Sequence, residues 1–319
     1  TLILGYMSEK LKIVFAGTPE FSVPTLVALN NNNIDVSLVL TQPDRPSGRG
    51  MKESFSPVKK IAISLSIPIH QPSTLKDDNT YEILKACQAD ILIVVAYGLI
   101  IPERILSLFP MGCYNVHASL LPRWRGAAPI HRAIESGDKK IGVTIMRVVK
   151  KLDAGPMIIK ECIDLNIDIT TGEATERLAK IGAKLMIQTI LLVERGNVIT
   201  SDEQEDGDAT YAEKINKIEA KLDMTQTPDV VIRKIHAFNP YPGISTTFHN
   251  KTLKLWRAVN FESLGIVEKM KIGKLYNYKG NLVIRLHTGV IKIIELQPEG
   301  KKKMDADSFL RGYEVDGIE

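Results

Sequence analysis

The sequence predicts an α/β domain built on a doubly wound parallel sheet, followed by a small antiparallel β-barrel domain. The first observation is a strand–helix–strand pattern whose strands, Lys12–Ala16 and Asp35–Leu40, are largely apolar. Apolar strands without alternation are typical of a parallel sheet covered on both faces. The second observation is the apolar run Asp90–Ala96. The third is a series of short strand-like runs separated by turns after residue 216, which is typical of a small barrel.

The first strand leads through Gly17 into a helix whose body is predicted over Ser22–Asn31. Thr18 can cap this helix with its side-chain oxygen, and Pro19 suits a first helical position because its ring fixes φ. The turn holds a single glycine, whereas a dinucleotide needs close backbone approach at several glycines. A dehydrogenase-type cofactor site is therefore disfavoured.

Residues 41–56 form a segment whose prolines and glycines predict irregular structure. Three of its side chains are basic, and guanidinium groups bind phosphate oxygens bidentately. From these residues alone, the segment suits contact with a nucleic-acid backbone and an ordinary solvated connection about equally. The residues concerned are Pro43, Pro46, Gly48 and Gly50, together with Arg45, Arg49 and Lys52.

The next elements lead to the predicted centre of the sheet. Spacing of apolar residues predicts helices over Pro57–Ser66 and Asp78–Cys87, with a short strand Pro68–His70 between them. Asp90–Ala96 is the most apolar strand and is placed centrally. Tyr97–Ile100 then lies at the carboxyl edge of the sheet, where open α/β folds bind ligands.

Residues 113–126 carry the strongest indication of chemistry. They begin as a short strand, Cys113–His117, whose alternating side chains place Asn115 and His117 on one face. Pro122 then ends regular structure. A carboxamide and an imidazole at a strand end can hold a carbonyl oxygen and move a proton. The alternative is a polar strand end with a satisfied histidine.

A possible third member of this site lies in a tight turn, Leu152–Pro156, after a predicted strand Ile141–Val148. Asp153 in this turn can brace its own backbone, or it can orient the imidazole of His117. Between the two regions, a helix is predicted over Ala127–Ser136, with its histidine, His131, on the surface.

The domain boundary is predicted after the long helix Thr171–Glu194, which is followed by Gly196, a typical helix stop. We expect a first domain over residues 1–196, an acidic linker over 197–215 and a β-barrel domain over 216–319. The elements expected in the last domain are a helix Asp229–Ala237, a turn Asn239–Gly243, and strands Ser245–His249, Leu253–Val259, Gly273–Tyr278, Leu282–Leu286 and Val290–Leu296.

Composition excludes several classes of protein. The 319 residues are 44% apolar and 24% charged, as in an ordinary globular protein, and no apolar run approaches the roughly 18 residues of a membrane span. Three cysteines without a paired spacing fit neither a disulfide framework nor a zinc site, so a reducing cytoplasm is expected. Residues 1–6 are a poor signal peptide, and Met7 is a plausible start. Residues 216–319 carry 17 basic against 12 acidic side chains, which favours a polyanionic partner such as nucleic acid as much as a plain basic surface.

Several motifs resemble the folate-dependent formyltransferases. They are Asn115-Val-His117, the run Ser-Leu-Leu-Pro-Arg-Trp-Arg-Gly at 119–126, and Asp153. The opening Phe15–Phe21, the loop Gln42–Lys52, the run Val94–Gly98 and the C-terminal barrel resemble the branch of that family that acts on initiator methionyl-tRNA. The resemblance extends from Leu11 to the C-terminus. It implies a Rossmann-like catalytic domain over residues 1–196 and an OB-like, tRNA-binding barrel over 216–319.

The resemblance also implies the substrates and the residues of the site. The formyl donor would be 10-formyltetrahydrofolate, the acceptor the methionine of an initiator methionyl-tRNA, with no metal and with the chain acting as a cytoplasmic monomer. The catalytic residues would be Asn115, His117 and Asp153. The folate-binding residues would be Val94, Ala96, Tyr97, Gly98, Leu99, Ser119, Leu120, Leu121 and Pro122. The tRNA-binding residues would be Arg45, Arg49, Lys52, Arg123 and Arg125.

Other functions share part of this pattern. A formyltransferase for another acceptor, or a formyltetrahydrofolate hydrolase, would use the same three polar residues, but the basic barrel and the arginine-bearing loop favour a tRNA acceptor. A non-catalytic RNA-binding protein would not require the three residues together, and a folate-binding assay separates that alternative.

Overall fold

The computed structural model describes residues 10–47, 52–196, 200–262, 265 and 267–318. Contacts between residues divide the chain into two compact units. Unit 1 comprises Thr1–Gly126, Gly142–Cys162 and Glu176–Tyr211, and unit 2 comprises Ala127–Ile141, Ile163–Thr175 and Ala212–Glu319. The predicted domains were continuous. In the structure, two short segments of the predicted first domain, 127–141 and 163–175, belong to unit 2. One reason is that α5 (Pro129–Ser136) packs against α7 (Pro228–Ala237) within unit 2.

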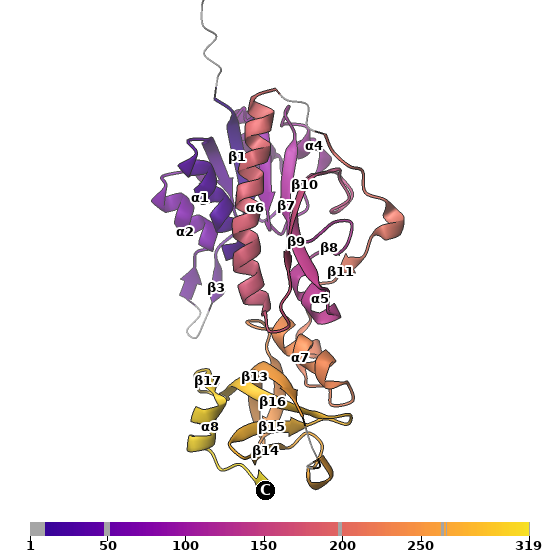
Figure 1. The fold of residues 1–319 in the computed structure, drawn as a ribbon. Helices are drawn as coiled ribbons and strands as arrows, with labels where there is room; N and C mark the ends of the chain where they lie inside the picture. The colour runs from indigo at the N-terminus through magenta and orange to yellow at the C-terminus, as the bar shows by residue number, and fades with distance from the viewer. Residues whose placement is uncertain (1–9, 48–51, 197–199, 263–264, 266, 319) are drawn as a thin grey trace, which may run out of the picture. The chain divides into compact units, whose positions relative to one another are not determined.

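Unit 1 is organised around a seven-stranded sheet in the order β10-β9-β7-β6-β1-β2-β5 (Figure 1). The pairs β5–β2, β2–β1, β1–β6 and β6–β7 are parallel, which confirms the predicted doubly wound α/β fold over five strands. The strands are β1 (Lys12–Gly17), β2 (Asp35–Leu40), β5 (Ile69–His70), β6 (Ile91–Val95), β7 (Cys113–His117), β9 (Lys140–Arg147) and β10 (Met157–Asp164).

The other end of the sheet departs from the prediction. β9 pairs antiparallel to β7, so the sheet is mixed and not wholly parallel. β10 continues it beyond β9, and no strand was predicted there. The burial of β10 alternates, and its polar residues (Lys160, Glu161 and Asp164) lie among the apolar ones. That pattern is typical of an edge strand, which is exposed to water on one side.

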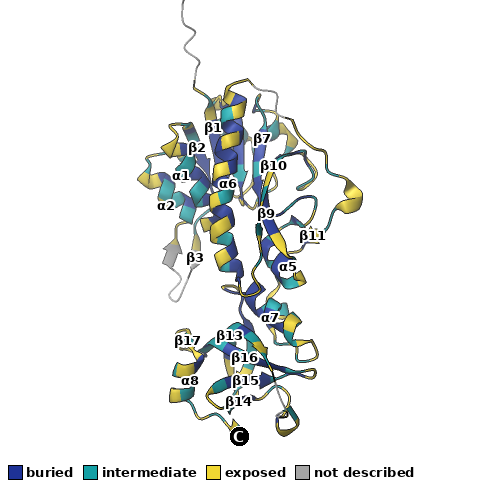
Figure 2. Cartoon of the chain, viewed as in Figure 1, coloured by how far each residue is buried: buried dark blue, intermediate teal, exposed yellow. Residues whose placement is uncertain are grey.

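The helices of unit 1 cover the sheet and bury its strands. Residues 13–16 of β1 have no exposed surface (Figure 2), and each such large apolar side chain stabilises the fold by about 1.5–3 kcal/mol. α6 approaches the sheet closely, because a Cβ on Gly182 would lie 2.5 Å from Val116 Cγ1. The helices are η1 (Glu20–Ser22), α1 (Val23–Asn31), α2 (Pro57–Ser64), α3 (Asp78–Ala86), α4 (Glu103–Leu106) and α6 (Thr171–Glu194).

The start of the first helix differs from the prediction. Thr18 does not cap it, because its hydroxyl instead donates to the backbone oxygen of Tyr97 at 3.1 Å. Pro19 precedes the short 3-10 turn η1, where no side-chain cap is formed. Thr18 thus ties the end of β1 to the chain that follows β6.

The segment predicted to be irregular contains a two-stranded antiparallel ladder. β3 (Arg45–Ser47) pairs with β4 (Lys52–Ser54), and Pro46 lies inside β3 opposite Glu53. Both strands of an isolated pair are edges, so proline's missing N–H can face outward without breaking the ladder. The prediction of irregular structure was therefore wrong for the two strands, while residues 41–44, 55 and 56 are irregular as predicted.

Unit 2 contains a second, mainly antiparallel sheet in the order β12-β13-β16-β15-β14-β18, which confirms the predicted antiparallel β domain. All five predicted strands are present. The strands β17 and β18, the helix α8 and the short 3-10 helices η3 (Lys217–Ala220) and η4 (Val267–Lys269) were not predicted. The elements are β12 (Ile244–Phe248), β13 (Lys251–Phe261), β14 (Leu275–Tyr278), β15 (Asn281–Arg285), β16 (Val290–Pro298), β17 (Met304–Asp305), α8 (Ala306–Gly312) and β18 (Gly317–Ile318).

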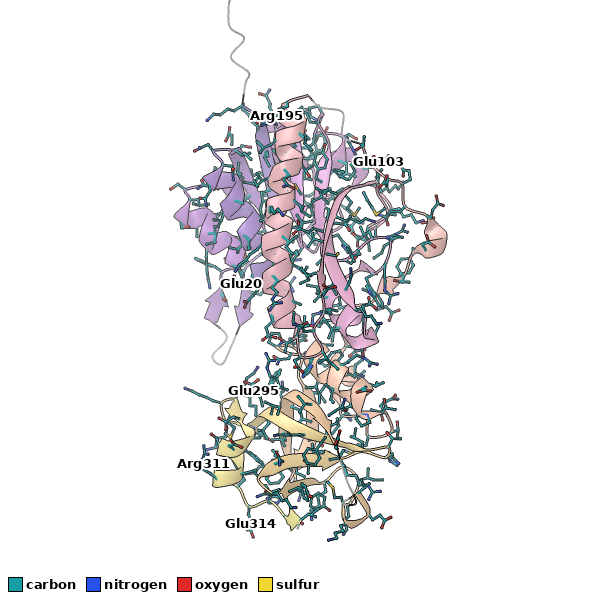
Figure 3. All side chains as sticks on the ribbon, in the orientation of Figure 1. Glu20, Glu103, Arg195, Glu295, Arg311 and Glu314 are labelled. Atoms are coloured by element: carbon teal, nitrogen blue, oxygen red, sulfur yellow. The ribbon has the colours of Figure 1, made fainter. Side chains whose placement is uncertain are left out.

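The surface of the chain carries most of its charge, and Glu103, Arg195 and Arg311 are exposed examples (Figure 3). His131 in α5 is an exception to its prediction. It is half-buried, and burial together with the charge of Arg132 lowers its pKa to about 4. Among the described residues, no helix is both long and apolar enough to cross a lipid bilayer.

Candidate active site

β7 carries the first two site residues to the end of the sheet. Val116 faces α6, so its neighbours Asn115 and His117 project from the opposite face, as the strand alternation predicts. The Asn115 side chain is half-buried and can be reached by a ligand. His117 is 5% exposed, so its contacts within the protein decide its orientation.

Each ring nitrogen of His117 faces an oxygen atom. Nε2 lies 2.9 Å from the backbone oxygen of Trp124, and Nδ1 lies 3.7 Å from Oδ2 of Asp153. A carbonyl oxygen can only accept a hydrogen bond, so Nε2 carries a proton. In the neutral ring, Nδ1 then presents its lone pair toward a carboxylate. This arrangement leaves Nδ1 as the position where a further proton can bind, with Asp153 beside it.

Asp153 is held away from ordinary backbone geometry. Its φ is +49°, in the left-handed region that few residues other than glycine adopt. Its Oδ2 accepts a hydrogen bond from the backbone N–H of Gly126 at 2.9 Å. The structure therefore brings Asn115, His117 and Asp153 together, and Asp153 points toward the imidazole as well as bracing the loop.

Segment 119–126 is fixed by hydrogen bonds to its own backbone. The Ser119 hydroxyl donates to the Arg123 oxygen at 2.6 Å. Thr144, which is fully buried in β9, donates to the Ser119 oxygen at 2.7 Å and accepts from the Leu121 N–H at 3.2 Å. Ser119 and Leu121 are both buried, so their side chains are closed to a ligand here, and their predicted contact with folate stays a prediction. Leu120 and Pro122 remain half-exposed.

The position of Arg125 differs from that expected of a tRNA-binding residue. Its side chain is 1% exposed, and its guanidinium donates to Gln204 at 3.0 Å and to Asp206 at 2.9 Å. It cannot reach a tRNA from this position, and its contacts make it a support of the loop. Hydrogen bonds from Lys151 and Arg125 lower the pKa of the Asp206 carboxyl.

The residues that sequence reasoning missed lie in the predicted linker. Gln204 donates to the backbone oxygens of Asp153 and Gly155, and the Thr210 hydroxyl accepts from the Trp124 N–H at 2.9 Å. The linker therefore packs along the site and does more than join domains. The sequence holds no signal for these contacts, because the burial of Arg125, which requires acceptors from this acidic segment, is seen only in the structure.

The predicted folate-binding edge follows β6. Ala96 and Gly98 are exposed and have positive φ values of 46° and 87°, and Val94 and Leu99 are half-buried. Tyr97 is 1% exposed, and burial raises the pKa of its hydroxyl. Its backbone oxygen already accepts from Thr18 and from Gln42 Nε2 at 3.1 Å each. The Tyr97 side chain therefore supports this edge from within, and its predicted contact with folate stays a prediction for the backbone.

Of the remaining predicted tRNA-binding residues, two have exposed side chains, one is described by its backbone alone, and one lies outside the described residues. Arg45 is exposed, and its Nη2 donates to Gln42 at 3.1 Å. Arg123 is exposed, with its guanidinium carbon 4.4 Å from the centre of the Trp124 ring. Lys52 belongs to β4 by its backbone, and Arg49 lies outside the described residues.

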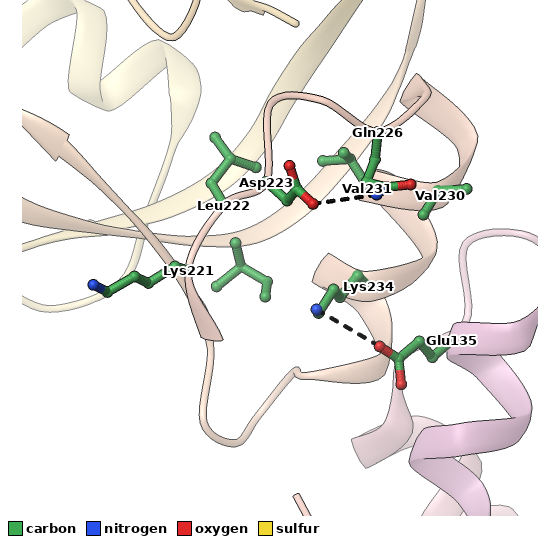
Figure 4. A pocket seen from close by; sticks show the side chains of 9 residues that line it. Glu135, Lys221, Leu222, Asp223, Gln226, Val230, Val231 and Lys234 are labelled. Atoms are coloured by element: carbon green, nitrogen blue, oxygen red, sulfur yellow. Dashed lines mark hydrogen bonds and ion pairs between the residues drawn. The ribbon is translucent and has the colours of Figure 1, made fainter. Parts of the chain in front are cut away.

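Unit 2 holds a separate cavity of about 270 Å³ (Figure 4). Three of its charged side chains have partners nearby, since Lys234 lies 3.8 Å from Glu135, and Asp223 accepts from Gln226 at 3.2 Å. None of the predicted site residues lines it. Across the described part of the chain, no group of three histidine, cysteine or acidic residues is arranged to hold a metal ion.

Comparison with known proteins places both parts of the chain in one family. A formyl transferase family model matches residues 11–190, and a model of the formyl transferase C-terminal domain matches residues 214–314. A methionyl-tRNA formyltransferase of Methylobacillus flagellatus is 45% identical over 302 residues, covering 95% of this chain and 96% of the relative.

Solved structures share the fold at low identity. The methionyl-tRNA formyltransferase of Clostridium thermocellum has a TM-score of 0.56 at 21% identity, covering 80% of this chain and 95% of that one. HypX from Aquifex aeolicus, in complex with tetrahydrofolic acid, has a TM-score of 0.67 at 17% identity over 97% of this chain. This chain spans only 49% of HypX.

Proposed function

The chain belongs to the formyl transferase family, and from that premise we propose that it transfers the formyl group of 10-formyltetrahydrofolate to the α-amino group of initiator methionyl-tRNA. A relative that shares 45% of its residues over nearly the full length of both chains is named for this reaction. The product would serve translation initiation, which places the proposed reaction in the cytoplasm, with the chain acting as a monomer.

One observation carries the proposal. His117 Nδ1 lies 3.7 Å from Asp153 Oδ2, and the half-buried Asn115 lies two residues before His117 on the same face of β7. Formyl transfer to an amine needs a donor for the negative charge that develops on the formyl oxygen, and a group that removes a proton from the attacking nitrogen. A carboxamide, an imidazole and a carboxylate supply both.

We assign the roles as follows. The Asn115 amide donates to the formyl oxygen as its charge develops, a contribution of a few kcal/mol for one well-placed donor. The Nε2–H of His117 turns from the Trp124 oxygen to the same substrate oxygen. Asp153 faces the other ring nitrogen and orients the ring, and the proton leaving the attacking amine passes through water to this pair. When the tetrahedral intermediate collapses, the bond between the formyl carbon and N10 of the folate breaks, and N10 takes up that proton so that tetrahydrofolate leaves. The reaction needs no covalent enzyme intermediate.

The fit of the formyl donor rests on the chain after β6. Ala96 and Gly98 leave backbone exposed at the carboxyl edge of the sheet, where a flat heterocycle can exchange hydrogen bonds with peptide groups. We propose that Val94, Ala96, Gly98 and Leu99 receive the pterin there, with Leu120 and Pro122 nearby on segment 119–126. HypX, whose crystal structure contains tetrahydrofolic acid, shares this fold.

The tRNA would be held by exposed basic groups outside the chemical site. We propose that Arg45, Arg49 and Lys52 contact the acceptor stem and that Arg123 contacts the 3′ end, while the basic residues of 216–319 add phosphate contacts. Each phosphate that the protein neutralises releases counterions, so the affinity should fall steeply with salt.

The test is formyl transfer from 10-formyltetrahydrofolate to methionine-charged initiator tRNA, with free methionine and a folate-only reaction in parallel. We expect formylation of the charged tRNA alone, and a large loss of kcat in His117→Ala with the melting temperature preserved. Turnover of folate without tRNA would replace the proposal with a hydrolase or a small-molecule transferase. Binding of tRNA without folate binding or turnover would indicate a non-catalytic RNA-binding protein.

A further inference from the structure

We propose that Gln204 is a positioning residue for Asp153. Its side chain holds the turn Leu152–Pro156 so that the Asp153 carboxylate stays beside His117. The inference rests on the proposed function, because it assigns Asp153 a part in formyl transfer. It is carried by hydrogen bonds within unit 1, and it concerns a residue of the segment that the sequence predicts to be a linker.

The turn that carries Asp153 needs support from outside. A residue other than glycine with a positive φ of 49° costs on the order of 1 kcal/mol or more, and such a conformation persists when neighbouring groups enforce it. The carboxylate must also keep its place near an imidazole that lies 3.7 Å away. A displacement of about 1 Å in such a group can cost about 100-fold in rate.

Gln204 provides that support at two points. Its Nε2 donates to the backbone oxygen of Asp153 at 2.9 Å and to that of Gly155 at 2.7 Å. An amide nitrogen has two protons, so both are used on the same turn. The Gln204 side chain thereby joins both sides of the residue between them, Ala154, and fixes the direction of the Asp153 backbone.

The orientation of the Gln204 amide is itself fixed. Its Oε1 faces Nε of Arg125 at 3.0 Å, and a guanidinium nitrogen can only donate. The backbone oxygens of Asp153 and Gly155, which can only accept, lie beside the Gln204 nitrogen. Both sides of the amide therefore require the same assignment of its oxygen and nitrogen.

The carboxylate and the backbone carbonyl of Asp153 are both tied to the same short strand, β8 (Arg125–Gly126). The Asp153 carboxylate is held by the N–H of Gly126 at 2.9 Å, and the Asp153 carbonyl is held through Gln204 by the side chain of Arg125. Arg125 is anchored in turn, because its backbone N–H donates to the Thr210 oxygen at 2.8 Å and its guanidinium pairs with Asp206. Gln204 closes this two-point attachment.

The kinetic test compares three variants with the wild-type chain. Gln204→Met keeps the length of the side chain and removes its hydrogen bonds. Gln204→Glu keeps the acceptor for Arg125 but sets a carboxylate against two carbonyl oxygens. Glu203→Gln, at an exposed neighbouring position, is the control. We expect both Gln204 variants to lower kcat by about 10- to 100-fold, with KM for tRNA and folate within about twofold and the control unchanged.

A double-mutant cycle with Asp153→Asn separates positioning from general stability. If Gln204 acts through Asp153, Gln204→Met causes little further loss of kcat in the Asp153→Asn background. Losses that multiply in the two backgrounds would overturn the proposal, as would a kcat of Gln204→Met within about twofold of wild type. If Asp153→Asn alone retains full kcat, the catalytic role of Asp153 fails, which is a different outcome.

Hydrogen–deuterium exchange tests the same inference without any turnover. Gln204→Met should raise the exchange rate of peptides covering residues 152–156 at least severalfold, while Glu203→Gln leaves it at the wild-type rate. Unchanged exchange in Gln204→Met would show that Gln204 does not hold the turn. If the wild-type chain does not formylate charged tRNA, the proposed function fails, and this measurement still decides whether the attachment exists.

Discussion

Segment 119–126 surrounds its second arginine with fixed partners, whereas the β3–β4 ladder holds Arg45 in the open. Arg125 is 1% exposed and makes side-chain bonds to Gln204 and Asp206. Arg45 is exposed, and its guanidinium donates a hydrogen bond to its near neighbour Gln42. Both residues belong to basic segments of unit 1, and the sequence predicts a contact with tRNA for both. The acceptors around each arginine, and not the loop that carries it, decide whether the charge is available to a partner.

The difference has a chemical meaning in the proposed reaction. A site that stabilises a developing charge works best when its groups are already in place, since reorganisation during the reaction costs free energy. A loop that contacts a large nucleic acid gains from groups that remain free to pair with phosphates. Unit 1 contains one segment of each kind, and the following changes in stability test the contrast.

The largest effect is expected from Arg125→Leu. Its removal leaves the Gln204 side-chain oxygen without its donor and Asp206 with Lys151 alone, and it breaks the packing around a buried side chain. We therefore expect the free energy of unfolding to fall by about 2–4 kcal/mol. Urea denaturation followed by Trp124 fluorescence measures this, in a Trp256→Phe background that removes the signal of unit 2. Arg195→Leu, at an exposed position, is the control (Figure 3). A loss below about 0.5 kcal/mol would mean that the buried arginine is not a support.

Thr144→Val should have the next largest effect. The change keeps the shape of the side chain but removes the hydroxyl that serves the Ser119 oxygen and the Leu121 N–H, both of which stay buried. We expect a loss of about 1–3 kcal/mol in the same assay. Thr200→Val, at an exposed position of unit 1, should change stability much less. Equal losses in the two variants would indicate that segment 119–126 is not fixed through Thr144.

The same contrast separates the features that the sequence predicts from those that it does not. Apolar runs such as Asp90–Ala96 predict the centre of the sheet, because burial on both faces requires them. The edge strand β10 was not predicted, because charged residues lie among its apolar ones and it therefore lacks a continuous apolar run. The proximity of Asn115 and His117 follows from strand alternation, and the approach of Asp153 was one of two readings of a turn.

The rest of the site could not be predicted because its partners are remote in the chain. Arg125 was assigned to tRNA from its local sequence, but the acceptors that bury it lie 79 and 81 residues further on. Gln204 and Thr210 lie in a polar segment whose composition is typical of a linker. Whether such a segment packs against a site depends on long-range geometry, which local periodicity does not report.

Asp206→Asn should have a smaller effect than either buried change, because its side chain is largely exposed and an amide oxygen still accepts from Arg125. Its effect should depend on pH. Hydrogen bonds from Lys151 and Arg125 lower the pKa of Asp206 in the folded chain, so ionised Asp206 stabilises the fold above the ordinary carboxyl pKa of 3.8. That advantage is lost as the pH falls through the lowered value. The difference between wild type and Asp206→Asn should therefore be constant above about pH 5 and shrink in stronger acid. A difference that grows in acid would contradict the assigned direction.

Arg45→Ala should leave stability unchanged within about 0.5 kcal/mol, because the side chain is exposed and its single partner, Gln42, can be solvated in its absence. Its effect should appear instead in tRNA use. If Arg45 neutralises one phosphate, the variant binds initiator tRNA more weakly, and the slope of log affinity against log salt falls by about one. The kcat at saturating tRNA should stay at the wild-type value, since Arg45 touches none of the three residues at the end of β7. Lys10→Ala, at another exposed position of unit 1, provides the matched loss of charge. An equal salt slope in the wild type and in both variants would show that the open arginine, despite its availability, is not used for the tRNA.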